Sequence, residues 1–150
     1  MPLKERIQAD IKEALRTKDE RALLVLRSLV ASIGNKAIEL GKKAEGLSEE
    51  ETEKVILSEI KKRKEAQGQY AKGGRQDLVE SERLEEEVLK KYAPEQMSDD
   101  ELGRIIDDII QTTGAAGPQD MGKVIKEVMA RVGTRASGSS VSALVKEKLK

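Results

Sequence analysis

The residues of this sequence best suited to chemistry are basic side chains and hydroxyls near its carboxyl end, and they suit phosphate binding. Lys123 follows Gly122 at the expected start of a helix, where free amides and the helix dipole attract anions. Arg131 and Arg135 flank a glycine loop, and a serine-rich stretch follows that loop. Arginine, hydroxyls and loop amides are usual donors to a nucleic-acid backbone. The candidate binding residues are Lys123, Lys126, Arg131, Arg135, Ser139 and Lys146.

The charge of this region is polarised along the chain. Residues 121–150 carry seven bases and two acids, whereas residues 98–120 carry six acids and one base, Arg104. The net charge of the whole chain is nevertheless zero. Such a dipole inside one small module indicates an electrostatically polarised surface. An ordinary helix-capping loop with surface lysines and arginines remains the alternative interpretation.

Catalytic arrangements find little support in the residue types. The chain has no histidine and no cysteine, so a nucleophilic serine has no histidine base and thiolate chemistry is excluded. The Gly73-Gly74 pair lacks the context of a phosphate-binding or dinucleotide-binding loop. Three consecutive glutamates, residues 85–87, spread over different faces of a helix and cannot form one compact metal site. The sequence therefore predicts no catalytic residue, no metal site and no cofactor.

A second basic run, residues 61–64, could bind nucleic acid as well. On a helix four consecutive residues sweep about 300°, so they do not form one patch, and a solvated helix exterior is favoured. Stacking of single-stranded bases requires aromatic side chains, and the chain has only Tyr70 and Tyr92. If the partner is RNA, we expect a folded RNA that is recognised by its shape and phosphates.

The elements that must position these residues are all expected to be helices. Charged residues make up 37% of the chain, and Glu, Lys, Arg, Leu and Ala are good helix formers. Apolar residues recur at helical spacing over four amino-terminal segments, residues 3–16, 20–40, 49–71 and 77–91. Three further helices are expected after residue 98, separated by glycine-containing loops at residues 114–118 and 133–138. The prediction is an all-α fold.

Capping signals and a proline divide the chain into two modules. Asp19 is a predicted N-cap, and Ser48 and Ser98 each begin a Ser-x-x-Glu capping box. Pro94 ends the fourth helix, because proline disfavours helix in the residue before it. We therefore predict an amino-terminal domain of long, hairpin-like helices over residues 1–97 and a three-helix carboxy-terminal module over residues 98–150.

No segment suggests export or membrane insertion. The amino terminus lacks the apolar core of a signal peptide, and no apolar run approaches the roughly 20 residues that span a bilayer. The sequence therefore predicts a cytoplasmic protein without a membrane partner.

Taken in order, several motifs resemble those of the GatB/YqeY-type family, and the similarity covers essentially the whole chain. They are Leu3-Lys4-Glu5-Arg6-Ile7 with Asp10, Val25-Leu26-Arg27, Asn35, Glu59-Ile60-Lys61-Lys62-Arg63, Gly74-Arg75-Gln76-Asp77-Leu78, Glu82, Tyr92-Ala93-Pro94, Asp120-Met121-Gly122-Lys123-Val124 and Ala136-Ser137-Gly138. The carboxy-terminal module of that family is similar to the tail of the B subunit of tRNA-dependent amidotransferases, which helps to hold tRNA. The resemblance thus implies a tRNA-binding helical tail.

Three functional hypotheses follow. The first is a non-catalytic accessory protein that binds tRNA, or a tRNA-containing complex, through the basic tail. The second is a protein–protein adaptor without RNA that docks through its amino-terminal helices, at Leu24, Val25 and Leu29. The third, a carbon–nitrogen ligase with glutamine as amido donor, is implied by the resemblance alone, and the chain is too short to contain the ATP-dependent core of that enzyme.

Overall fold

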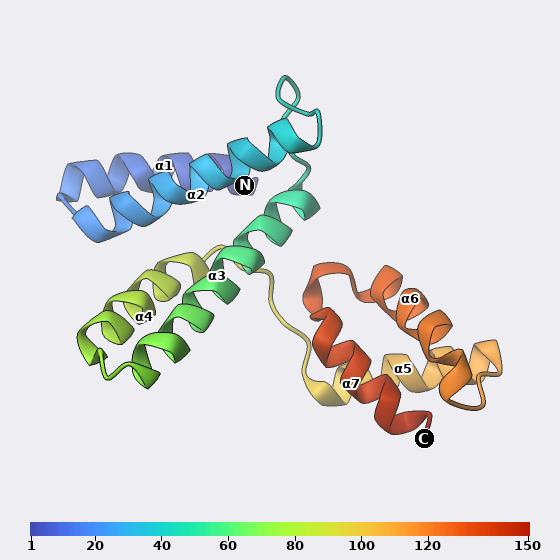
Figure 1. The fold of residues 1–150 in the computed structure, drawn as a ribbon. Coiled ribbons are helices and arrows are strands. Elements are labelled where there is room, and N and C mark those ends of the chain that lie inside the picture. Colours follow the sequence, from blue (N-terminus) through green and yellow to red (C-terminus); the bar gives the residue numbers. More distant parts are fainter. The chain divides into compact units, whose positions relative to one another are not determined.

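The structure, a computed structural model, describes residues 1–150 as helices joined by loops, without a β-strand (Figure 1). The predicted all-α fold is therefore confirmed. None of the helices is long and apolar enough to cross a bilayer. The seven α-helices are α1 (Leu3–Thr17), α2 (Glu20–Glu39), α3 (Glu49–Lys72), α4 (Gln76–Lys90), α5 (Asp99–Thr113), α6 (Met121–Val132) and α7 (Gly138–Lys148), with two short 3-10 turns, η1 (Pro118–Asp120) and η2 (Gly133–Arg135).

The chain divides into two compact units, Met1–Ala93 and Pro94–Lys150. The boundary lies before the segment 94–97, which we had expected to close the first domain. Two hydrogen bonds attach that segment to the second unit: the Met97 amide donates to the Arg135 carbonyl at 2.8 Å, and Gln96 Nε2 donates to the Thr134 carbonyl at 2.9 Å.

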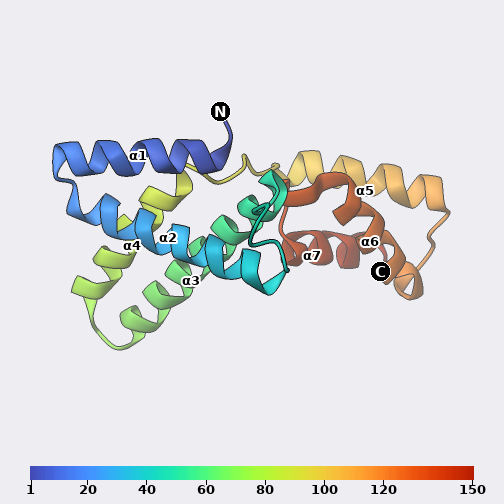
Figure 2. The ribbon, with the colours of Figure 1, turned by 90° about the horizontal axis from the view of Figure 1, so that it is seen from above.

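The first unit consists of two helical hairpins, α1 with α2 and α3 with α4 (Figures 1 and 2). Aliphatic residues from all four helices, together with Tyr92, form its apolar core. The Tyr92 hydroxyl donates a hydrogen bond to the Asp10 carboxylate. Burial and this carboxylate raise the pKa of Tyr92, so the phenol remains a hydrogen-bond donor at neutral pH. Tyr92 therefore connects the segment after α4 to α1.

The buried side of α2 agrees only in part with the one that apolar spacing predicts. That spacing puts Leu23, Leu26, Val30, Ile33 and Ala37 on one face, which Leu24, Val25 and Leu29 widen. Leu26 and Ala37 are buried as predicted. In the structure Val25 and Leu29 are 1% exposed, whereas Val30 lies at the surface. Periodicity shows that a helix has an apolar side, but the packing of α1, α3 and α4 against α2 decides how the helix is rotated.

Charged residues occupy the contact between α3 and α4 beyond the apolar core. The Arg63 guanidinium lies 3.4 Å from the Glu85 carboxylate and 3.7 Å from that of Glu82. Burial, with the neighbouring Glu85 charge, raises the pKa of Glu82. The Nε of Arg63 and one carboxylate oxygen of Glu82 are buried without a hydrogen bond. Arg63 therefore lies between α3 and α4. The other residues of the basic run, Lys61, Lys62 and Lys64, are exposed.

The second unit is a three-helix assembly with its own apolar core from α5, α6 and α7 (Figure 1). Leu102, Ile106 and Val128 are among its most buried residues. The helix starts agree in part with the predicted caps. Ser98 accepts a hydrogen bond from the Glu101 amide, but the reciprocal bond of a capping box is absent. The Ser-x-x-Glu pattern therefore predicts one hydrogen bond, from the Ser98 amide to the Glu101 carboxylate, that the structure does not contain.

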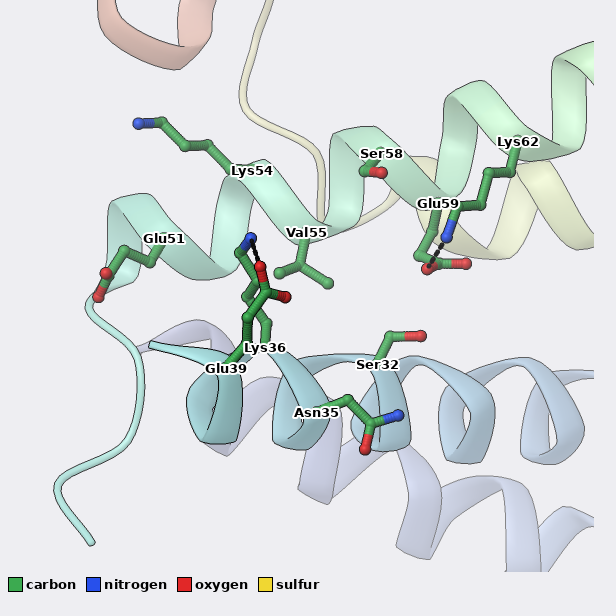
Figure 3. Close-up of a pocket in the computed structure, with 10 residues that line it drawn as sticks. All are labelled: Ser32, Asn35, Lys36, Glu39, Glu51, Lys54, Val55, Ser58, Glu59 and Lys62. Carbon is green, nitrogen blue, oxygen red and sulfur yellow. Dashed lines mark hydrogen bonds and ion pairs between the residues drawn. The ribbon is translucent and has the colours of Figure 1, made fainter. Parts of the chain in front are cut away.

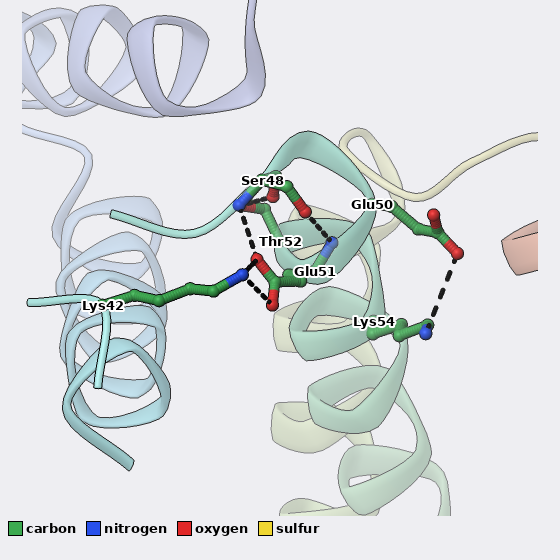
Figure 4. Close-up of polar contacts among 6 residues, drawn as sticks. All are labelled: Lys42, Ser48, Glu50, Glu51, Thr52 and Lys54. Atoms are coloured by element: carbon green, nitrogen blue, oxygen red, sulfur yellow. Dashed lines mark hydrogen bonds and ion pairs between the residues drawn. The ribbon is translucent and has the colours of Figure 1, made fainter. Parts of the chain in front are cut away.

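The start of α3 contains the complete capping box that was predicted (Figure 4). Ser48 Oγ accepts from the Glu51 amide at 3.1 Å, and the Ser48 amide donates to the Glu51 carboxylate at 2.9 Å. Lys42, from the loop after α2, also donates to that carboxylate at 2.8 and 2.9 Å. The Lys42 ammonium and the Ser48 amide lower the pKa of Glu51 to about 2. One carboxylate thus caps α3 and holds the preceding loop.

Because the pKa of Glu51 is lower in the folded chain, its stabilising effect is present above the usual glutamate pKa of about 4.3 and is lost as the pH falls towards 2. We expect Glu51→Gln to lower the thermal unfolding midpoint at pH 6, and the difference from wild type to disappear near pH 2. Circular dichroism melts over this range measure the effect. Glu50→Gln is the matched control, because the Glu50 carboxylate contacts only Lys54, at 3.8 Å. Equal behaviour of the two variants would contradict the assignment.

Candidate functional site

Two basic residues of the second unit are neutralised by α5. Arg131 of α6 lies 2.7 Å from the Asp108 carboxylate, and Lys148 of α7 lies 2.8 Å from that of Asp107. Neighbouring aspartates of α5 thus reach different helices, since consecutive residues point about 100° apart. The acidic helix therefore engages the sides of α6 and α7 that face it.

Lys126 and Lys146 lie on other sides of the same helices. Five residues separate Lys126 from Arg131, and at about 100° per residue the two side chains point roughly 140° apart. Lys146 and Lys148 differ by two residues and point roughly 160° apart. Because Arg131 and Lys148 face α5, Lys126 and Lys146 must face away from it. Both lysines are exposed and have no ion pair within the chain.

Three other candidates lie near the ends of α6 and α7. Lys123 is exposed in the first turn of α6, Arg135 is exposed in η2 between the two helices, and Ser139 is exposed in the first turn of α7. The side chains of Lys123 and Arg135 have no partner in the structure, whereas Ser139 Oγ lies 3.2 Å from Ser137 Oγ. We use the name basic seam for four exposed bases of α6, η2 and α7: Lys123, Lys126, Arg135 and Lys146.

The local geometry at Lys123 differs from the prediction. The turn η1 precedes α6, and the Met121 amide donates to the Pro118 carbonyl, so this amide is not free for an anion. The Asp120 carboxylate accepts from the Ala116 amide at 3.0 Å and adds negative charge beside the helix start. One amide at the start of α6 is therefore already taken, and the nearby carboxylate weakens the attraction of this helix end for a phosphate.

The six predicted residues thus fall into different environments. Four of them, the bases of the basic seam, are exposed and have no partner, and Ser139 lies in the first turn of α7. Arg131 belongs instead to the ion pair with α5, and only the acidity of residues 99–108 indicates in the sequence that such a pairing is available. Exposed bases without an internal ion pair are suited to contact with a polyanion.

A polar cleft of about 490 Å³ between α2 and α3 is the main alternative site, in the first unit (Figure 3). Its lysines and glutamates pair with one another or with neighbours. Lys36 lies 3.2 Å from Glu39, and Lys62 lies 3.4 Å from Glu59. Glu51, at the rim, is occupied by Lys42. With its charges balanced in this way, the cleft has no excess charge to attract a phosphate.

Comparison with known proteins finds relatives over most of the chain. A protein of Lachancea thermotolerans named "Altered inheritance of mitochondria protein 41, mitochondrial" is 27% identical over 150 residues, which cover 96% of this chain and 79% of the relative. A protein of the same name from Pyrenophora tritici-repentis is 28% identical, covering 95% of this chain and 78% of the relative. A third, from Saccharomyces cerevisiae, is 33% identical over 87 residues, covering 57% of this chain and 45% of the relative.

These relatives correct one prediction. Their names place them in mitochondria, whereas the sequence pattern predicts a cytoplasmic protein. The predicted cytoplasmic location is therefore wrong by this comparison. It had rested only on the lack of a recognisable targeting or membrane segment, which is a weak basis for a location.

The family comparison agrees with the resemblance that the motifs suggested. The family model described as "Yqey-like protein" matches residues 4–149, which include both units and all four bases of the seam. The chain belongs to the YqeY-like protein family.

Proposed function

We propose that this protein is a non-catalytic accessory factor that binds folded RNA, tRNA above all, through the basic seam. The observation that carries the proposal is the division of bases in the second unit. Arg131 and Lys148 are neutralised by α5, whereas Lys123, Lys126, Arg135 and Lys146 are exposed and unpaired. An unpaired base can replace a counterion at a phosphate without first breaking an internal ion pair.

The composition favours a folded RNA over a single strand. The second unit contains no aromatic side chain, so it offers no surface on which unstacked bases could stack. Helical RNA is instead recognised largely through its phosphates and its shape. The resemblance of the tail to the amidotransferase B subunit makes tRNA the first RNA to test.

If the four bases of the seam each contact one phosphate, log affinity should fall against log salt concentration with a slope of roughly −3 to −4. We expect Lys126→Gln combined with Lys146→Gln to weaken tRNA binding about tenfold or more at low salt, and to make the slope shallower by roughly 1.5 to 2. Fluorescence anisotropy with labelled tRNA over a salt series measures both quantities.

The chain offers a closely matched control in the same unit. Arg131→Gln combined with Lys148→Gln removes the same charge from the same two helices, but from bases already paired with Asp108 and Asp107. We expect this variant to lose clearly less affinity. An equal loss in both variants would show that net charge, and not the seam, governs binding. Absence of tRNA binding by wild type at about 50 mM salt would refute the proposal.

The choice of folded RNA is tested separately. We expect tRNA to compete for the protein at least about tenfold better than an unstructured oligouridine of the same length, because the second unit lacks stacking residues. A competition titration in one buffer decides this point. Equal competition would indicate a general affinity for polyanions and would contradict recognition of folded RNA.

A further inference from the structure

The short turn that carries Arg135 has no side-chain contact that fixes its basic group. This turn, η2, joins α6 to α7, and Arg135 is its last residue. The Arg135 side chain is exposed and forms no ion pair in the structure. The position of its guanidinium therefore depends on how the backbone of the turn is held.

Buried residues hold both ends of η2. Val132, directly before the turn, is 2% exposed and Ala136, directly after it, is 8% exposed, and both belong to the apolar core of the second unit. Gly133 has a φ of 58° and a ψ of −127°, a conformation that residues with a Cβ rarely adopt. Glycine at this position therefore allows the chain to turn out of α6 between the two buried residues.

Gln96, in the segment before α5, contacts this turn. Its Nε2 donates to the Thr134 carbonyl at 2.9 Å and to the Pro94 carbonyl at 3.1 Å. A side-chain amide nitrogen carries two hydrogens, so it can make both bonds at once. Because both neighbours are carbonyl oxygens, they also define which end of the amide is the nitrogen. Gln96 thus bridges the segment 94–97 and η2.

The backbone next to Gln96 makes a second bridge to the turn. The Met97 amide donates to the Arg135 carbonyl at 2.8 Å. Met97 packs against the apolar core of the second unit, and the next residue, Ser98, caps α5. The segment is therefore anchored at the start of α5, and the two bridges hold the carbonyls of Thr134 and Arg135 in place relative to that helix.

We propose that Gln96 is a positioning residue for RNA binding, which holds η2 so that Arg135 reaches an RNA phosphate. The inference rests on the proposed function of the basic seam and adds to it a residue that carries no charge. An ordered turn restricts the positions of the Arg135 guanidinium before RNA arrives, so less freedom is lost when the phosphate is bound. Gln96 acts through Arg135 and needs no contact with RNA of its own.

Gln96→Met in the full-length chain tests the proposal, because methionine has a similar length but cannot donate a hydrogen bond. We expect this variant to bind tRNA about threefold more weakly at about 50 mM salt, and to make the slope of log affinity against log salt shallower by up to roughly 0.9, as for one lost phosphate contact. A shallower slope from an uncharged substitution would not arise if Gln96 only stabilised the fold. Fluorescence anisotropy with labelled tRNA measures both quantities.

Arg135→Gln completes a double-mutant cycle. If Gln96 acts through Arg135, Gln96→Met should cause no further loss of tRNA affinity when Arg135 is already replaced. Gln111→Met is the matched control, because Gln111 is exposed near the other end of α5 from Met97. We expect this control to bind tRNA like wild type.

The order of the turn can be measured without RNA. We expect the heteronuclear NOE values of the Thr134 and Arg135 amides to fall in Gln96→Met, with the circular dichroism spectrum of wild type retained. Unchanged NOE values would overturn the inference.

The binding data separate this inference from the proposed function on which it rests. The inference alone is overturned if wild type binds tRNA but Arg135→Gln binds equally well, or if Gln96→Met has no effect or the same effect with and without Arg135. If wild type does not bind tRNA at about 50 mM salt, RNA binding by the seam is refuted and the role of Gln96 is refuted with it.

Discussion

Burial of aliphatic side chains in the second unit fixes the rotation of each of its helices, and the position of every charge depends on this rotation. With Val124 and Val128 in the core, Arg131 is directed towards α5 and Lys126 away from it. With Val145 in the core, Lys146 and Lys148 take opposite sides of α7. The apolar core therefore divides the bases into a set paired with α5 and an unpaired set. The proposed RNA surface is the electrostatic consequence of that division.

Burial of aliphatic side chains also fixes the rotation of α2 in the first unit, where it leaves apolar residues at the surface. Val25, Leu26 and Leu29 of α2 are required in the core, so Leu24, Val30 and Ile38 remain at the surface. This outcome revises the adaptor hypothesis, which had used Leu24, Val25 and Leu29 as one docking surface. Two of those three residues, Val25 and Leu29, are buried and cannot contact a partner.

Features that depend on neighbours in sequence were predictable. The helices follow from periodicity, and the Ser48 and Asp19 caps follow from side chains that bond to amides three residues ahead. Features that depend on contacts between helices were not. The position of Arg63 between two glutamates, the Tyr92–Asp10 hydrogen bond and the pairing of Arg131 with Asp108 join residues far apart in sequence. Periodicity contains no information about which neighbour a helix turns towards.

We propose that the four bases of the basic seam form the RNA-binding surface. Amide chemical shifts of the isotope-labelled full-length chain, followed by NMR during a titration with tRNA, test it most directly. We predict that the largest changes occur around Lys123, Lys126, Arg135 and Lys146, with small changes in α5. Changes concentrated in α5 or in the first unit, or no changes at all, would contradict it.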